Sequence, residues 1–450
     1  MKAHVALKKL GRKADVMLES TSSLSNRASN RASKLDQDLI KKGRAPHARP
    51  RTLVPVQHGH HVELTPWQVL HTFARTVALA GQGSARAVAQ HWDCLRYVTA
   101  LDSTAQDEMQ LSSNGNDLNY HRKGAQARDL GTAFGLAAAQ QILREQFPGY
   151  RFDALDSELV LTAFCGSGTD RPAAGTSATR PNHLLVGRKP GAPVRVIAID
   201  ARGSHNKTDP TPTALAQSAR RVHGLVLGES DLRGAPFPGL MTATWLRRDG
   251  IGIRLLAAEG NGVLTVPDPS VPAEDDAILP LITTTVNGER TQRQGFAVRD
   301  DRHDWLARLL LRTSAASLLT FAGNRAAARD LLTERQRTRL GTTASAAVPG
   351  MQGDARITLG GMPFVGTDQV FRLNGERVEV YSALLADQYQ RLSDGLIDDH
   401  EAGIPAALAA WRRNAKKAHI EWGKTGLVHM DASGALLAIR PRIRNSKLLS

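Results

Sequence analysis

The chain has 450 residues, more than one typical domain needs, so its length predicts two or three domains. No run approaches the roughly 20 apolar residues of a membrane span, and the N-terminus lacks the apolar stretch of a signal peptide, so we expect a cytoplasmic protein without membrane contact. Only Cys94 and Cys165 are present, which excludes a disulfide framework and a cysteine zinc site.

The formal charge of +15 is concentrated near the N-terminus. Residues 1–51 hold thirteen Lys or Arg against four Asp or Glu, and the duplicated stretch SNRASNRAS, residues 25–33, offers little apolar surface. We therefore predict that residues 1–52 form a disordered basic arm, which could bind nucleic-acid phosphates or only keep the chain soluble. The candidate nucleic-acid-binding residues are Lys8, Lys9, Arg12, Lys13, Arg27, Arg31, Lys41, Lys42 and Arg44.

Residues 53–124 predict a helical segment, because apolar residues recur there at helical spacing. Thr65 is placed to cap the first helix, and Pro66 suits its first position. Three histidines between residues 57 and 61 lie in a glycine-containing loop without a cysteine or carboxylate framework, so we expect no metal site there.

Residues 125–265 predict an α/β core. The order helix, three strands, helix, strand is typical of a mixed sheet flanked by helices. The second helix carries Gln217, and Asp249-Gly250 predicts the turn of a hairpin. The first helix is expected at residues 126–147, and the three strands at 157–164, 183–188 and 193–200.

The last third has a different pattern. Residues 266–345 predict a helical connector, and residues 346–450 predict an α+β module. In the module, Asn374-Gly375 predicts a hairpin turn, and Trp411 and Trp422 are expected to anchor a helix by packing.

The stretch VRVIAIDARGSHNK, residues 194–207, combines a β-branched strand with an acidic residue, Asp200, and a basic residue two positions later, Arg202. The preceding strand opens with Pro181-Asn182. In this order, residues 125–260 resemble the PD-(D/E)xK superfamily of restriction-endonuclease-like folds. They are also similar to uncharacterised proteins of high-GC actinobacteria.

The resemblance implies a site in which two carboxylates hold Mg²⁺ and a lysine helps to position the attacking water. Asp200 matches this pattern, but Asn182 stands in place of the second carboxylate. Arg202 replaces the lysine, and its planar guanidinium is better suited to gripping a phosphate than to deprotonation chemistry. Groups elsewhere could complete the site: Lys207 as the cation, and Asp170, Glu145, Asp129 or Glu158 as metal ligands.

Three functional hypotheses follow. The leading one is a bacterial DNA-binding protein, alone or as a homodimer, whose degenerate nuclease-like core contacts the DNA backbone through Arg202 and Lys207 without cleaving it. The second is a Mg²⁺-dependent DNA endonuclease that uses Asp200, a recruited carboxylate and Lys207. The third is a scaffold or interaction protein that never meets nucleic acid.

Overall fold

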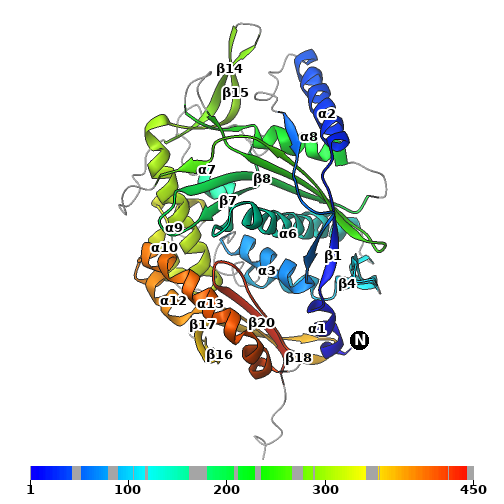
Figure 1. Cartoon of the computed structure of the whole chain (residues 1–450), viewed down its shortest axis with the longest axis vertical. Coiled ribbons are helices and arrows are strands. Elements are labelled where there is room, and N and C mark those ends of the chain that lie inside the picture. Colours follow the sequence, from blue (N-terminus) through cyan, green and yellow to red (C-terminus); the bar gives the residue numbers. More distant parts are fainter. Residues whose placement is uncertain are drawn as a thin grey trace, which may run out of the picture.

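In the computed structural model, a large curled mixed sheet lies between helices (Figure 1). None of the described helices has the length and apolar character that crossing a membrane requires. The structure describes residues 2–42, 52–79, 90–104, 106–116, 120–161, 180–206, 211–228, 235–265, 277–286, 289–340, 353, 355–423 and 425–442.

The central sheet has the strand order β3-β1-β12-β11-β8-β7-β6, with β2 and β13 paired to β12 and β8. Strands β6, β7 and β8 are antiparallel neighbours, whereas β11 runs parallel to β8 and antiparallel to β12. The bounds are β1 Ala14–Glu19, β2 Leu53–Pro55, β3 His61–Leu64, β6 Arg151–Asp156, β7 His183–Arg188, β8 Val194–Ser204, β11 Gly239–Leu246, β12 Ile251–Ala258 and β13 Val263–Leu264.

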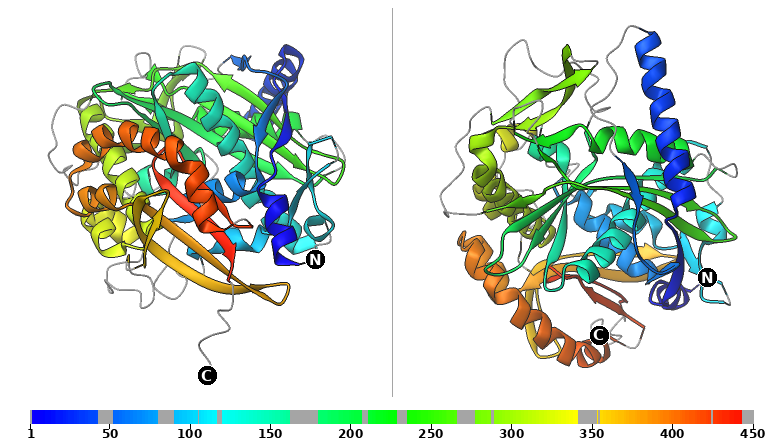
Figure 2. Two further views of the ribbon diagram at one scale, coloured as in Figure 1. Left: turned by 60° about the horizontal axis from the view of Figure 1, so that its bottom comes forward. Right: turned by 45° about the horizontal axis from the view of Figure 1, so that its top comes forward.

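Helices cover both faces of this sheet (Figures 1 and 2). Successive side chains of a strand point to opposite faces, so Ala201 of β8 meets Gly135 of α6 while Asp200 points to α8. Helix α3 packs on α6, and α2 packs on α8. The bounds are α1 Ala3–Leu10, α2 Ser22–Lys41, α3 Pro66–Val77, α5 Ser113–Asn116, α6 Tyr120–Gln146, α7 Ser157–Leu161 and α8 Thr211–Val222, with a 3₁₀ helix at Asp93–Tyr97.

Smaller sheets complete the fold. Four strands follow the order β10-β9-β15-β14, five follow the order β16-β17-β18-β20-β19, and β4 pairs with β5. The strands are β4 Leu101–Ser103, β5 Met109–Leu111, β9 Leu225–Leu227, β10 Ala235–Pro236, β14 Ile278–Val286, β15 Glu289–Val298, β16 Ala355–Leu359, β17 Met362–Leu373, β18 Glu376–Leu385, β19 Leu427–Met430 and β20 Ala435–Pro441. The helices here are α9 His303–Phe321, α10 Arg325–Leu331, α11 Glu334–Arg339, α12 Ala386–Ser393 and α13 Ile397–Trp422, with a 3₁₀ turn at Asp300–Arg302.

Residues 2–42 do not form the expected disordered arm. Strand β1 lies inside the central sheet, antiparallel to β3 and parallel to β12. The prediction from composition overlooked two local patterns. Apolar residues recur at helical spacing in α1, including Leu7 and Leu10, and Val16 and Leu18 alternate with polar or exposed residues in β1. All four of these side chains are buried, so the basic N-terminus is built onto the core.

The prediction of a strand at residues 157–164 is also wrong, because residues 157–161 form helix α7. The edge strand β6 comes earlier, and its Asp156 accepts a hydrogen bond of 2.7 Å from the backbone N–H of Glu158. This short polar side chain ends the strand and begins the helix. Residues 162–179 lie outside the described part of the chain.

The predicted helical connector is only partly helical. Residues 278–298 form the hairpin of β14 and β15, and α9, α10 and α11 follow it. The hairpin is rich in Thr, which favours strands. Its apolar residues do not alternate regularly, so the sequence pattern did not predict the two strands.

Several local predictions are confirmed. Strands β11 and β12 join at the Asp249-Gly250 turn, and β17 and β18 join at Asn374-Gly375, where both residues have positive φ. A two-residue turn of this kind matches the twist of the strands that it joins. Trp411 and Trp422 are buried in the cluster between α13 and the five-stranded sheet, as expected.

The domain boundaries drawn from the sequence stay a prediction. A continuous buried cluster includes residues from Ala3 in α1 to Ile439 in β20. Helix α1 contacts β20, and the indole of Trp67 in α3 donates to the carbonyl of Leu437 at 3.1 Å.

Two glycines set the distance between α6 and β8. A Cβ added to Gly131 would lie 2.3 Å from the Cα of Gly203, whereas Gly124 on the same helix has open space around it. We predict that Gly131→Ala lowers the free energy of unfolding by about 1–3 kcal/mol through overpacking. Gly124→Ala, the matched control, should raise it by up to about 1 kcal/mol because alanine favours the helix. Urea denaturation measures both, and equal effects would contradict this packing.

Three buried histidines, His71, His91 and His400, and the half-buried His429 make the fold sensitive to acid. Burial lowers the pKa of His91 and of His400 to about 3 and of His429 to about 4, and it also lowers the pKa of His71. Between about pH 6.5 and these values, the unfolded chain binds protons that the folded chain does not.

We therefore predict that stability falls as the pH drops below about 6.5, by about 1.4 kcal/mol per pH unit for each such histidine. Urea denaturation between pH 7 and pH 5 measures this slope. Replacement of buried His91 by Gln should make the slope shallower by one proton, whereas His60→Gln, at an exposed position, should leave it unchanged. A slope that His91→Gln does not alter would contradict the prediction.

Candidate nucleic-acid interface at the end of strand β8

The carboxylate of Asp200 is fully buried between β8 and α8. It accepts hydrogen bonds from the hydroxyl of Ser218 at 2.6 Å and from the guanidinium groups of Arg202 and Arg221 at 3.0 and 3.2 Å. A buried carboxylate needs such donors, because water cannot solvate its charge. Asp200 therefore joins the strand to the helix that follows it.

Arg202 extends this cluster. Its Nε donates to Asp200, and its Nη1 donates to Oε1 of Gln217 in α8 at 2.6 Å. The three residues that the sequence placed on successive elements, Asp200, Arg202 and Gln217, thus lie together. Two acceptors, one on β8 and one on α8, hold the guanidinium.

Asn182 bridges the backbone of the neighbouring strand. Its Nδ2 donates to the carbonyl of Ala201 at 2.7 Å, and its Oδ1 accepts from the N–H of the same residue at 3.0 Å. An aspartate could not donate the first of these bonds, so the asparagine has a structural reason to stand here. Both halves of the amide are used in the β8 ladder.

Three of the proposed additional metal ligands lie in the described chain, namely Glu145, Asp129 and Glu158, and each has partners outside the Asp200 cluster. Helix α6 covers the opposite face of the sheet, and its Glu145 lies beside His58, with Nε2 and Oε2 3.0 Å apart. Asp129 accepts from Tyr97 at 2.8 Å, and Glu158 pairs with Arg180 at 2.5 Å. Lys207 and Asp170 lie outside the described residues, within which no group of three or more metal-ligating side chains occurs.

Part of the basic N-terminus is occupied by ion pairs. Lys9 pairs with Asp102 and Lys13 with Glu63, both at 2.5 Å, and Arg12 pairs with Asp107. The other candidates in the described chain are exposed: Lys8 on α1, and Arg27, Arg31, Lys41 and Lys42 on or at the end of α2. Arg44 lies outside the described residues.

An arginine-lined cavity of about 180 Å³ opens where β8 and β11 end. Because these strands are parallel, their carboxyl ends share one edge of the sheet, a common place for ligands in α/β proteins. Arg202, Arg247 and Arg254 line the cavity with Trp245, and no Asp or Glu is among its described lining residues. Hydroxyl and amide groups complete the lining: Ser204, Asn206, Thr211 and Thr244.

Contacts hold these arginines in place. Arg254 donates to Glu19 and to Thr211, each at 2.6 Å, and its guanidinium lies 5.0 Å from the ring centre of Trp245. Arg247 donates to the carbonyl of Asn206 at 3.1 Å. The cavity therefore presents guanidinium groups on an ordered framework, and two of them pair with carboxylates outside the lining: Arg254 with Glu19 and Arg202 with Asp200.

Helix α2 leads away from this cavity. The Nε of Arg31 donates to Thr213 at 3.2 Å, two residues from Thr211 in the cavity wall. Five residues further on, Asp36 of α2 still pairs with Arg220 of α8 at 3.8 Å, and only the last part of the helix projects from the body of the protein (Figure 2). The sequence pointed to Arg202 and to the basic residues of α2, but not to Arg247 and Arg254, because only the folded hairpin brings these two to the end of β8.

The Asp200 cluster predicts a stability defect. Asp200→Ala removes the acceptor of three hydrogen bonds and leaves two arginines without their carboxylate, so it should lower the free energy of unfolding by about 2–4 kcal/mol. Asp398→Ala is the control, because the Asp398 carboxylate is 63% exposed and its ion pair with Arg308 should contribute less than about 1 kcal/mol. Urea denaturation measures both, and equal losses would contradict the structural role of Asp200.

Comparison of the chain with protein-family models, with curated proteins and with solved structures found no match. The functional argument therefore rests on the Asp200 cluster and the arginine-lined cavity.

Proposed function

We propose that this chain is a DNA-binding protein that holds backbone phosphates in the arginine-lined cavity and does not cleave them. The observation that carries this proposal is the set of three arginines at one sheet edge, without a carboxylate among the described lining residues. Guanidinium groups bind phosphate oxygens in pairs, and such contacts supply affinity without reading sequence.

The arrangement of elements supports a restriction-endonuclease-like type for the core. Helix α6, the antiparallel strands β6, β7 and β8, and helix α8 occur in the order that the resemblance implies, with the short helix α7 between β6 and β7. The strand directly after α8 is β9, which joins the four-stranded sheet, and the later strand β11 is the parallel neighbour of β8. The placement of Arg202 at the end of the third strand also agrees with it. A bacterial, cytoplasmic setting and a homodimer belong to the same proposal.

The state of Asp200 argues against hydrolysis. A metal-dependent nuclease needs carboxylate oxygens that are open to Mg²⁺, but Asp200 is fully buried and already accepts three hydrogen bonds. Asn182 is likewise engaged with the backbone of Ala201. The Mg²⁺-dependent endonuclease is the alternative, and it requires this cluster to open.

The test is fluorescence anisotropy with labelled duplex DNA over a series of salt concentrations. We predict that a variant combining Arg247→Ala and Arg254→Ala binds about tenfold more weakly and has a salt slope smaller by about two, because two phosphate contacts are lost. Arg372→Ala removes an exposed arginine from the distant β17–β18 hairpin and is the matched control. Circular dichroism of each variant verifies its fold.

Three outcomes separate the hypotheses. Equal losses in the double variant and in Arg372→Ala would show that the cavity is not the DNA site. Nicking of supercoiled plasmid with Mg²⁺ or Mn²⁺, abolished by Asp200→Asn, would establish the endonuclease instead. Absence of DNA binding at low salt would leave the scaffold hypothesis.

A further inference from the structure

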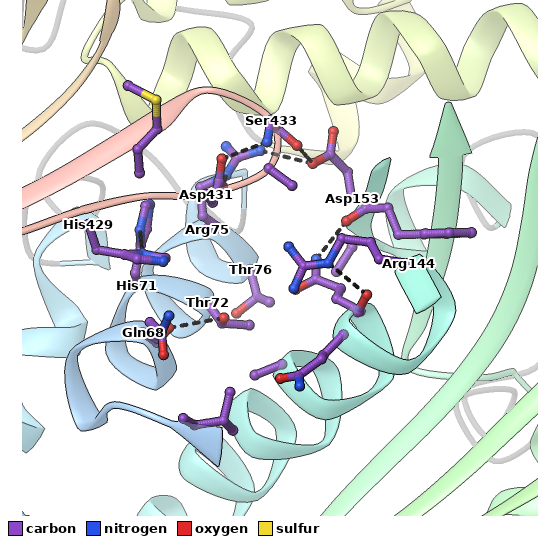
Figure 3. Close-up of a pocket in the computed structure, with 18 residues that line it drawn as sticks. Gln68, His71, Thr72, Arg75, Thr76, Arg144, Asp153, His429, Asp431 and Ser433 are labelled. Carbon is purple, nitrogen blue, oxygen red and sulfur yellow. Dashed lines mark hydrogen bonds and ion pairs between the residues drawn. The ribbon is translucent and has the colours of Figure 1, made fainter. Parts of the chain in front are cut away.

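A second polar cavity, of about 130 Å³, lies away from the Asp200 cluster, on the side of the sheet that α6 covers (Figure 3). Its walls come from α3, α6, β6 and the turn between β19 and β20. Each helix presents polar residues at the spacing of one helical face: Gln68, His71, Thr72 and Arg75 on α3, and Gln140, Gln141 and Arg144 on α6. The α3 face is buried or half-buried, whereas on α6 Gln140 and Gln141 are half-buried and Arg144 is exposed at the outer end of the cavity.

The two carboxylates of this cavity are already neutralised. Asp431 accepts from Nε of Arg75 at 3.2 Å and from the backbone N–H groups of Ser433 and Ala435 at 2.8 and 3.0 Å. Asp153 is buried and accepts from the guanidinium of Arg188 and from the hydroxyls of two serines: Ser314 and Ser433. Neither carboxylate needs a cationic ligand.

Among the described residues, Arg144 is the arginine of this cavity whose charge is not paired with a carboxylate. Its Nε donates to the carbonyl of Gln140 at 3.1 Å, and no Asp or Glu in the described chain lies within ion-pair distance of its guanidinium. Burial lowers the pKa of Arg144, the nearby carboxylates of Asp431 and Glu145 raise it, and Arg412 of α13 lowers it. The charge of Arg144 in turn lowers the pKa of His429, after the larger effect of burial. In Figure 3 its guanidinium reaches into the space between the walls. Because Arg188 from outside the lining pairs with Asp153, and Arg75 pairs with Asp431, the charge of Arg144 is the one that no ion pair in the described lining offsets.

Two further polar atoms in the wall lack a partner among the described residues. They are Nη1 of Arg75 and Nε2 of His71, and both are buried. Nδ1 of His71 lies 2.7 Å from Nδ1 of His429, so when Nδ1 of His71 accepts in this pair, its Nε2 carries the proton and can donate to an anion. A buried polar atom without a partner costs about 1–3 kcal/mol, which a bound group with oxygen atoms would offset.

We infer that this cavity binds a small oxyanion, either phosphate or a short carboxylate, held by the guanidinium groups of Arg144 and Arg75. The donors are those of an anion site, since guanidinium groups pair with the oxygens of both anions. The size fits as well, because a cavity of about 150 Å³ can hold a molecule with about six non-hydrogen atoms. The site is separate from the proposed DNA-binding cavity and does not depend on it.

Isothermal titration calorimetry of the full chain tests this inference, with inorganic phosphate, acetate and pyruvate titrated at constant ionic strength. We expect saturable binding of at least one anion to the wild type, and binding at least tenfold weaker in Arg144→Gln. Arg144→Lys, which keeps the charge, should lose less. Arg413→Gln, at an exposed position on α13, is the matched control and should bind as the wild type does.

A second control separates this site from the DNA site, whose arginines could also take phosphate. The variant with Arg247→Ala and Arg254→Ala should keep the calorimetric signal, and Arg144→Gln should keep its affinity for DNA. If no anion binds above the level seen with chloride, or if Arg144→Gln binds like the wild type, the cavity holds water only and the inference is wrong. Saturation by phosphate but not by the carboxylates, or the reverse, identifies the ligand class.

Discussion

The buried carboxylate of Asp200 fixes the relation between the central sheet and the helix on one of its faces. Its bonds to Ser218 and Arg221 hold α8 on β8, and its bond to Arg202 sets the direction of that side chain at the strand's end. The arginine-lined cavity depends on this arrangement, since Arg202 forms one wall. A buried carboxylate needs hydrogen-bond donors in place of water, and the residues that supply these donors are thereby fixed in position.

The two cavities use opposite faces of the same sheet. On the α8 face, arginines gather at the ends of parallel strands without carboxylates among the described lining residues. On the α6 face, Asp153 and Asp431 pair with arginines of the framework, and Arg144 remains for a ligand. The high net charge is thus not a diffuse property of a tail, because part of the N-terminal charge is neutralised locally by Asp102 and Glu63.

Sequence patterns predicted features that are set by local chemistry. The hairpin turn at Asn374-Gly375, the capping box that Thr65 forms at α3, and the strand that carries Asp200 and Arg202 all follow from short stretches of chain. Asn182 had a visible signal too, in its place before a strand, but its pairing with Ala201 required the register between β7 and β8.

Other features depend on distant segments and could not be predicted from local patterns. The N-terminus forms a strand because β12, more than 200 residues later, offers it a parallel partner. The second cavity combines a face of α3, a face of α6 and a turn near the C-terminus. Each of these pieces alone has the appearance of an exposed polar surface.

The central claim is that Asp200 holds the fold together and binds no metal. Electron paramagnetic resonance of free Mn²⁺, titrated with the wild type and with Asp200→Asn in the presence of DNA, tests it most directly. The account predicts the same small uptake of Mn²⁺ by both proteins. A stoichiometric Mn²⁺ site in the wild type that Asp200→Asn removes would contradict it.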